Sequence, residues 1–593
     1  MGNDLKGLLS SLNVAALKEL LAHIPGAGEE TRKDDIINRI ARGMEQPTLT
    51  TIWNGLDETQ QLAVAESLYD AGGEYSAKQF EAKYRRLPAF RQPGPEGHRG
   101  SIEVRSALTL FIHYVYLGRG VALDVVPGDL RARLTTFVPC PAKMELKCSQ
   151  TLPDTEELTV RLTEREATQE LAVMLRTIAE TRLPVGDKTA VPGAAAVKAL
   201  SEKLVGGDFY AGVVKKNVRD REIGAIKAFA WPLLLQAGGL VSRAGGRMGL
   251  RPAGQKALVA RPEPVIKGLW EKWVQTAIFD EFSRIDEIKG QNSKGPVMTD
   301  VGSRRETIDD ALRACPPGQW VMIDDFSRFI RATDDTFSVS TDPWKLYIAE
   351  REYGSLGDNG SDGWNILEER YLLVLLFEYA ATLGMVDVAF VNPAGARNDF
   401  GDLWGTDDLD YLSRYDGLRA FRLTPLGAYV FGDDVAYEAE SVQGNATLTV
   451  LPELNILVQG ELNEEECFVL RVWTAQRPDG GWHLDTAKTI ETLENGQNIS
   501  VLRGFLESRS TEPLHERAVA FLERCAKNSR ALKITGQANI VECNNSESAD
   551  LISRHKDTKT LCVRIGPKML MVRTQHQQKF HVRVRALGIG MVD

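Results

Sequence analysis

Apolar and polar residues recur along this 593-residue chain with two different periods. Apolar positions three and four residues apart predict helices, whereas strict alternation predicts half-buried strands. Within residues 11–44, two apolar stripes on either side of a Gly-containing turn predict a helical hairpin: Leu12, Leu17, Leu20 and Leu21, then Ile36, Ile37 and Ile40. Because both periods occur over a length that exceeds a single core, we expect a helix-rich α+β protein of several domains.

Residues 56–140 are expected to form a compact module of three helices followed by a strand. The first helix ends at Gly72-Gly73, and Ser76 begins the second as its N-cap. The stretch 106–118, SALTLFIHYVYLG, is predicted as the third helix, and residues 121–126 as the strand. This order of elements is typical of a winged helix.

Two later stretches repeat one pattern: a helix, Gly-apolar-Val, a strand, a turn, a second strand and Leu-x-Pro-x-Gly. The matching segments are Gly239-Leu-Val241 with Leu250-Arg-Pro-Ala-Gly254, and Gly384-Met-Val386 with Leu423-Thr-Pro-Leu-Gly427. The proline falls near the first position of a helix, where its missing N–H costs nothing. The repetition predicts tandem winged-helix modules over residues 160–262 and 263–440.

The last quarter of the chain carries a resemblance to a known family. Alternation at 448–458 predicts a strand or hairpin, and helices are expected at 464–475, 500–509 and 513–527. Val450-Leu-Pro-Glu-Leu-Asn-Ile-Leu-Val458 and Phe505-Leu-Glu-Ser-Arg-Ser-Thr-Glu-Pro-Leu514 resemble the N-terminal, helicase-associated domain of XPB-type DNA helicases. The resemblance implies a DNA-handling α+β domain over residues 446–593 that works beside a superfamily 2 motor, without making this chain a motor.

The helical hairpin of residues 1–46 resembles the SAP motif of chromatin and DNA-repair proteins. The matching pattern is L-N-V-x-x-L-K-E-L-L, a Gly-containing turn, and R-K-x-x-I-I-x-R-I. Members of that family bind DNA near the start of the second helix, which implies Arg32 and Lys33 as contacts. A hairpin that only docks on protein has the same apolar stripe, so both interpretations stay open.

The composition is that of an ordinary soluble protein, 43% apolar and 26% charged. No run of 18 apolar residues occurs and the N-terminus lacks the features of a signal peptide, so we expect no membrane association. Seven dispersed cysteines without a C-x-x-C pair predict reduced thiols in the cytoplasm and no zinc site.

Charge is distributed unevenly around a net value of −10. Residues 198–259 hold 11 Lys/Arg against 4 Asp/Glu, and residues 535–593 hold 9 against 5. Residues 300–440 hold 12 against 27. Two basic regions therefore flank an acidic middle, which we expect to bind protein because carboxylates repel phosphates.

The first repeat carries the strongest basic cluster, because Arg243 and Arg247 flank a tight Ala-Gly-Gly turn. Such cations neutralise phosphates and release counterions, which gives affinity with little base specificity. A solvated surface with long side chains over apolar neighbours is the alternative. The candidate DNA-binding residues of this region are Lys215, Lys216, Arg219, Arg221, Arg243, Arg247 and Arg251.

The C-terminal candidates rest on a predicted strand at 580–585. Alternation there places His581, Arg583 and Arg585 on one face, which suits a nucleic-acid backbone. A charged edge strand protected from further pairing is the alternative. The candidate residues of this region are Arg573, Lys579, Arg583 and Arg585.

Sequence motifs for catalysis are missing. The chain has neither G-x-x-x-x-G-K-[ST] nor a D-E-x-H box, and no cofactor is expected. Asp324-Asp325 are expected to cap a helix and not to bind metal. We therefore expect a non-catalytic, cytoplasmic DNA-binding accessory factor that recruits or regulates a superfamily 2 helicase, in bacterial DNA repair or phage defence. The alternatives are a scaffold of packed winged helices without DNA binding, and an enzyme whose site has no recognised motif.

Overall fold

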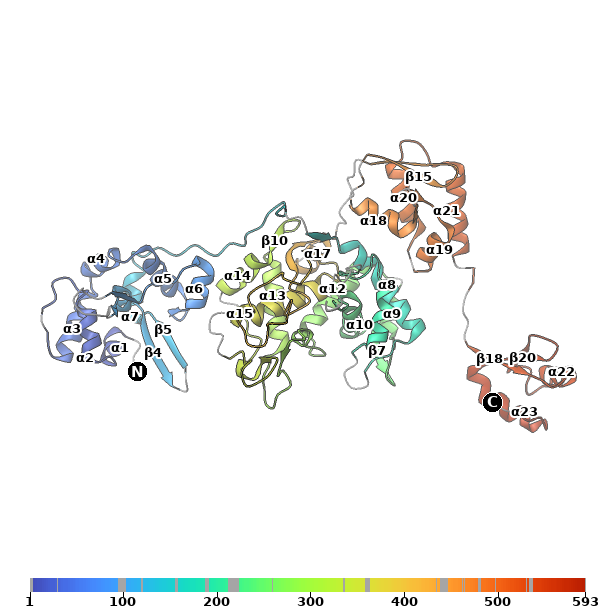
Figure 1. Ribbon diagram of the computed structural model, residues 1–593, viewed down its shortest axis with the longest axis horizontal. Helices are drawn as coiled ribbons and strands as arrows, with labels where there is room; N and C mark the ends of the chain where they lie inside the picture. The colour runs from blue at the N-terminus through green and yellow to red at the C-terminus, as the bar shows by residue number, and fades with distance from the viewer. Residues whose placement is uncertain are drawn as a thin grey trace. The chain divides into compact units, whose positions relative to one another are not determined.

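The computed structural model divides the chain into two compact units, Met1–Gln443 and Gly444–Asp593, which are described separately (Figure 1). The fold is helix-rich α+β, with several small sheets. The structure describes residues 4–28, 30–93, 103–118, 121–154, 158–186, 191–211, 223–258, 260–333, 336–357, 363–432, 435–437, 446–460, 462, 464–477, 481–495, 497–529, 531–532 and 537–591.

The N-terminal part of the first unit has one hydrophobic core, which runs from Leu5 to Val138. Both helices of the predicted hairpin are present, and the Asn13 side chain caps the first by accepting a hydrogen bond from Ala16 N–H at 2.8 Å. The helices are α1 (Leu5–Ser10), α2 (Val14–Leu21), α3 (Lys33–Gly43) and α4 (Thr48–Asn54). The hairpin therefore shares its core with the module that follows it.

That module consists of a helix, a short strand, two further helices and a hairpin. In order, its elements are α5 (Glu58–Tyr69), β1 (Glu74–Tyr75), α6 (Ala77–Tyr84), η1 (Ala107–Leu110), β4 (His113–Gly118), β5 (Val121–Val125) and α7 (Gly128–Leu134). The strand order is β1-β5-β4, so the first short strand pairs with the last strand. A separate hairpin joins β2 (Arg91–Pro93) to β3 (Glu103–Arg105).

The helix predicted at 106–118 is wrong after its first turn. Only the short 3₁₀ helix η1 forms, and the chain then extends as β4, which pairs with β5 from His113 to Gly118. Tyr114 and Tyr116 alternate outward and are 66% and 63% exposed. Aromatic and β-branched residues favour a pleated strand once a partner strand is present, and β5, which begins at Val121, provides that partner.

The second module has the same order of elements. They are β6 (Thr159–Arg161), which precedes the module, then α8 (Glu164–Thr181), α9 (Ala194–Ser201), α10 (Lys227–Ala237), β7 (Val241–Ala244), β8 (Arg247–Leu250) and α11 (Pro252–Ala257). The extended segment Leu183–Val185 takes the place of the short strand, because Met248 N–H donates to the carbonyl of Leu183 at 2.8 Å. Here too the first extended segment pairs with the last strand.

The third module is larger and contains a four-stranded sheet in the order β10-β13-β12-β6. Its elements are α13 (Val301–Arg313), β10 (Trp320–Met322), α14 (Ile323–Ala332), α15 (Gly363–Ile366), α16 (Glu368–Val374), the π-helix η5 (Leu375–Ala380), β12 (Val386–Phe390), β13 (Leu418–Leu423) and α17 (Pro425–Phe431). Before and within it lie α12 (Pro262–Gln275), η2 (Glu281–Arg284), β9 (Ile288–Lys289), η3 (Pro343–Lys345) and β11 (Tyr347–Ile348). The second predicted wing, β12–β13, is thus part of a buried sheet.

The predicted sequence repeat is also a repeat of backbone contacts. Arg251 N–H donates to Leu240 O at 2.9 Å, and at the matching position Thr424 N–H donates to Met385 O at 3.1 Å. The glycine that ends each Leu-x-Pro-x-Gly lies against the same carbonyl. A Cβ on Gly254 would lie 2.2 Å from Leu240 O, and one on Gly427 would lie 2.1 Å from Met385 O.

The second and third modules share a single core that runs from Ala167 to Phe431. Helix α10 is buried from Lys227 to Leu235, and every residue of α16 and η5 is buried. Helix α10 and η5 pack against each other. The helix that precedes the hairpin in these two modules is therefore enclosed by protein.

The second unit contains two hydrophobic cores. The first, from Leu448 to Cys525, lies among β14 (Thr447–Val450), β15 (Asn455–Gln459), α18 (Glu464–Trp473), β16 (Ala475–Gln476), β17 (Trp482–His483), α19 (Thr486–Glu494), α20 (Ile499–Arg509) and α21 (Glu516–Asn528). The second, from Cys543 to Val584, lies among β18 (Ala538–Glu542), α22 (Ser546–Arg554), β19 (Cys562–Arg564), β20 (Met569–Arg573), η6 (Thr574–His576) and α23 (Gln577–Ala586). The predicted hairpin and the three predicted helices of 446–534 are present.

The strand predicted at 580–585 is wrong, because these residues belong to helix α23. Phe580 and Val584 are its buried residues, four positions apart and hence on one face. Two apolar contacts at helical spacing outweigh a local alternation that extends over only six residues.

Candidate nucleic-acid interface

The hairpin β7–β8 is an exposed basic feature among the predicted sites. Its two-residue turn is Gly245-Gly246, with φ values of 58° and 70°. Both residues at positive φ define the type of turn that matches strand twist, and glycine adopts it without strain. Arg243 and Arg247 flank the turn as predicted, and both are exposed.

The chain continues from this hairpin into further cations. Residues 241–262 contain five Lys/Arg and no Asp/Glu. Arg251 at the N-cap of α11 and Lys256 within it are exposed, as is Arg182 at the end of α8. Since no carboxylate of this stretch offsets them, the hairpin and α11 present a local positive surface, which we call the basic wing: Arg182, Arg243, Arg247, Arg251 and Lys256.

Lys215, Lys216, Arg219 and Arg221 lie outside the described residues. The residues on either side of that segment are connected through Asp208. Its carboxylate accepts hydrogen bonds from the N–H groups of Ile226, Lys227 and Ala228 at 3.1 to 3.2 Å. Asp208 and residues 226–228 therefore lie together at the N-terminus of α10.

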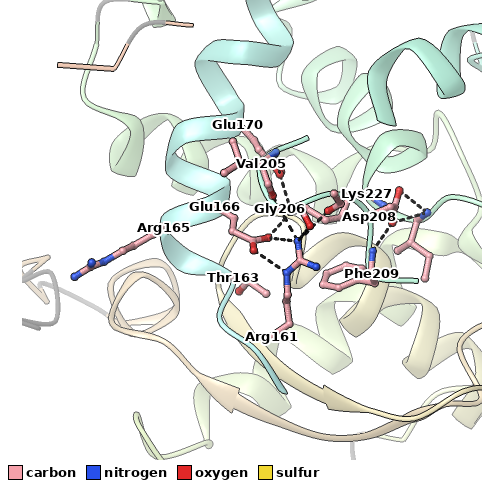
Figure 2. Close-up of polar contacts among 12 residues, drawn as sticks. Arg161, Thr163, Arg165, Glu166, Glu170, Val205, Gly206, Asp208, Phe209 and Lys227 are labelled. Atoms are coloured by element: carbon pink, nitrogen blue, oxygen red, sulfur yellow. Dashed lines mark hydrogen bonds and ion pairs between the residues drawn. The ribbon is translucent and has the colours of Figure 1, made fainter. Parts of the chain in front are cut away.

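A buried charge network holds the same region together, and the sequence reading missed it. Lys227 on α10 donates to Glu166 and Glu170 on α8 at 2.6 and 2.7 Å (Figure 2). Arg161 on β6 donates to both oxygens of Glu166 at 2.7 and 3.0 Å. Trp231 Nε1–H donates to Glu170 at 2.9 Å. Two cations and two carboxylates thus join β6, α8 and α10.

The protonation of this network follows from burial and pairing. Burial raises the pKa of Glu170, and Lys227 opposes that rise. Burial alone would lower the pKa of Lys227, but the carboxylates of Glu170 and Glu166 raise it overall. Lys227 therefore stays protonated in the folded protein. The available signal was the pair Glu166 and Glu170, which falls on the apolar face of α8 with Ala167 and Leu171.

Arg32 and Lys33 lie at the start of α3 as predicted. Arg32 is exposed at the N-cap position, while Lys33 Nζ donates to the carbonyl of Ser10 at 2.7 Å. Asp34 and Asp35 follow directly in the first turn. Arg32 and Lys33 thus present less positive charge to a ligand than the sequence indicates.

The four C-terminal candidates are all exposed: Arg573 ends strand β20, and Lys579, Arg583 and Arg585 lie on helix α23 and not on a strand. Lys579 and Arg583 are four residues apart and share a face of α23. Arg585 shares a hydrogen bond of 3.2 Å with His581. The predicted cations are therefore exposed, but those of residues 580–585 lie on a helix and not on a strand.

In the acidic loop between β12 and β13, one carboxylate is hydrogen-bonded to an arginine and several others are exposed. Asp399 accepts hydrogen bonds from the buried Arg370 at 2.7 and 3.1 Å. The exposed carboxylates are Asp402, Asp407, Asp408 and Asp410.

Asp324 and Asp325 lie in the first turn of α14, whose N-cap is Met322, so the predicted capping role is wrong. Asp325 pairs with Arg328 at 3.3 Å.

Within the described ranges, no group of three or more His, Cys, Asp and Glu has the arrangement of a metal site. No described helix combines the length and apolar character needed to cross a membrane. The sequence matches no protein-family model and no curated protein.

Proposed function

We propose that this chain is a non-catalytic DNA-binding accessory protein that holds duplex DNA through its phosphates and acts beside a separate superfamily 2 helicase or translocase. The observation that carries the proposal is the basic wing: its residues Arg243, Arg247, Arg251 and Lys256 are exposed, and the stretch 241–262 that contains them has no Asp or Glu. Arginine on a tight hairpin is well suited to phosphate contacts, which carry affinity without reading bases.

The order of elements supports a winged-helix interpretation of all three modules. In each module a helix, an extended segment, two helices and a hairpin follow one another, and the first extended segment pairs with the last strand. A winged helix reads bases with the helix that precedes the hairpin. Because α10 and α16–η5 are buried, we propose that the wing and its flanks bind DNA without a recognition helix.

The test is the salt dependence of binding to duplexes of unrelated sequence, measured by fluorescence anisotropy. Each phosphate contact adds about −0.9 to the slope of log K against log salt. Reversing two contacts in Arg243→Glu/Arg247→Glu should reduce the slope by about 2 and weaken binding equally for all sequences. The matched control is Lys488→Glu/Arg503→Glu, which makes the same charge change at exposed sites on α19 and α20.

The second candidate function is a protein-interaction scaffold that does not touch DNA. Two observations favour it: the buried helices α10 and η5 pack against each other, and the acidic loop exposes four carboxylates. A scaffold predicts no DNA affinity at low salt for the parent protein, and hence nothing for the wing variant to lose. Equal affinity of parent and wing variant would also contradict the DNA proposal.

The helicase partnership rests on the resemblance of residues 446–593 to the helicase-associated domain of XPB-type proteins. Its test is capture of a superfamily 2 motor by the tagged chain, identified by mass spectrometry. Purified chain should not hydrolyse ATP or cut DNA alone. Turnover by the isolated chain that does not come from a contaminant would instead favour an enzyme with an unrecognised site.

A further inference from the structure

A polar pocket of about 580 Å³ lies in the first unit and shares no residue with the basic wing. Its walls come from α6, α14, the start of α16, the loop after β12, and β13. This volume lies in the range of small-molecule sites. The pocket is lined by five arginines: Arg85, Arg328, Arg331, Arg397 and Arg419.

Two carboxylates of the pocket wall are already engaged by protein. Glu369 pairs with Arg397 and accepts a hydrogen bond from Ser327 Oγ at 2.9 Å. Asp399 is held by both terminal nitrogens of Arg370. These contacts fix the position of Arg397 and of the loop that carries it, so the wall is formed before any ligand arrives.

Arg419 on β13 differs from these groups. Among the described residues, none accepts a hydrogen bond from its guanidinium or forms an ion pair with it, and its side chain is partly buried. Burial, and then the nearby Arg397 guanidinium, lower the pKa of Arg419. The Nε–H groups of Arg397 and Arg328 are buried and have no acceptor in the described chain.

Partly buried cations without a partner are costly, and an anionic ligand would remove that cost. Guanidinium groups match the oxygens of phosphate in geometry and form strong charge-assisted hydrogen bonds with them. The wall also holds the side chains of Glu81, Asn398 and the exposed Asp324, whose carboxylate lies 4.0 Å from Arg397. A ligand that fits this wall therefore carries a phosphate group together with hydroxyl or amino donors.

We propose that this pocket binds a phosphate monoester of the size of a nucleoside monophosphate, with Arg419 and Arg397 contacting the phosphate oxygens. The site is separate from the basic wing and does not depend on the proposed DNA binding. Either a free phosphorylated molecule or the 5′-phosphate at a strand end has this chemistry.

The experiment is calorimetric titration of the full chain with inorganic phosphate and with AMP, at constant ionic strength. AMP should bind, and Arg419→Gln should weaken binding by roughly tenfold to a hundredfold, the loss expected for a charged hydrogen-bond donor. The matched control, Arg422→Gln, removes an arginine from the same strand that pairs with Asp387 and should bind AMP normally. Circular dichroism checks that each variant is folded.

A pair of strands, one with a 5′-phosphate and one with a 5′-hydroxyl, distinguishes the two sources of the ligand. Preference for the phosphorylated strand identifies a strand end, and tighter binding of AMP identifies a free molecule. The proposal is overturned if the parent chain binds none of AMP, phosphate and the 5′-phosphorylated strand at millimolar concentration. It is also overturned if Arg419→Gln binds AMP with unchanged affinity. The wing variant Arg243→Glu/Arg247→Glu should keep AMP binding, so failure of one proposal is not failure of the other.

Discussion

At the scale of single residues, the main finding is that charge in this protein has two distinct roles. Arg243 and Arg247 are exposed with no carboxylate nearby in the chain, while Lys227 and Glu170 are buried and bound to each other. Sequence counts treat these side chains alike. Only burial distinguishes an exposed cation from one that, like Lys227, joins two helices.

Replacing Lys227 by Met should destabilise the first unit. Removing one partner of a buried ion pair leaves carboxylates without compensation and costs about 3–5 kcal/mol. Urea denaturation of the full chain measures the change. Lys488→Met, at an exposed pair with a 4.0 Å separation, should change stability by less than about 0.5 kcal/mol. Equal effects of the two variants would contradict the role given to the buried network.

His113 should make stability depend on pH. Burial lowers its pKa to about 4, whereas an unfolded histidine titrates near 6.5. Between these values the unfolded chain binds more protons, so the stabilisation is complete above pH 6.5 and is lost as the pH falls towards 4. The unfolding free energy should fall by about 3 kcal/mol, because the two pKa values differ by about 2.5 and each pKa unit corresponds to about 1.36 kcal/mol.

The measurement is urea denaturation of the parent chain and of His113→Gln at several pH values from 4 to 7. The difference in unfolding free energy between them isolates the histidine from other titrating groups. That difference should shift in favour of the variant as the pH falls. A difference that stays constant across this range would rule out a buried neutral imidazole.

At the scale of elements, the repeated hairpins show which parts of the fold a sequence pattern predicts. Gly239 and Gly384 both adopt positive φ, and each is followed by a residue whose carbonyl meets the glycine of Leu-x-Pro-x-Gly. A repeated pattern of Gly and Pro records backbone geometry, so it was visible in the sequence. Helix α23 was not, because its neighbours α22 and β20 decide which residues are buried.

Placing a methyl group at Gly254 or Gly427 should destabilise the corresponding module. The added Cβ would lie within 2.2 Å of a backbone carbonyl oxygen, and relieving that overlap costs about 1–3 kcal/mol. Gly268→Ala is the control, since nothing lies within 4 Å of a Cβ there and the residue is inside α12. Alanine at that position should stabilise by about 0.5–1 kcal/mol. Thermal unfolding compares the three variants.

At the scale of the whole molecule, each hydrophobic core lies within one of the two units. The cores of Leu5–Val138 and Ala167–Phe431 belong to the first unit, and those of Leu448–Cys525 and Cys543–Val584 to the second. The basic wing and the arginine-lined pocket are both in the first unit. The C-terminal cations of α23 are in the second.

Residues 1–443 and 444–593, produced separately, should each fold, because each retains its complete cores. The first fragment should keep AMP binding and most of the DNA affinity, since it contains the basic wing. Circular dichroism and cooperative urea unfolding test the folding, and anisotropy tests the binding. A first fragment that is folded but has no affinity for DNA would place the DNA surface in residues 444–593.

The sequence by itself determined the α+β class, the N-terminal helix pair, the repeated hairpins and the basic wing, because these depend on local periodicity, turn residues and neighbouring charges. The tertiary structure alone decided that β4 is a strand and α23 a helix, that α10 is buried, and that Lys227 meets Glu170. It also decided that Arg419 lines a pocket and has no partner among the residues that the structure describes. These features depend on residues far apart in the chain that come together only when the cores pack.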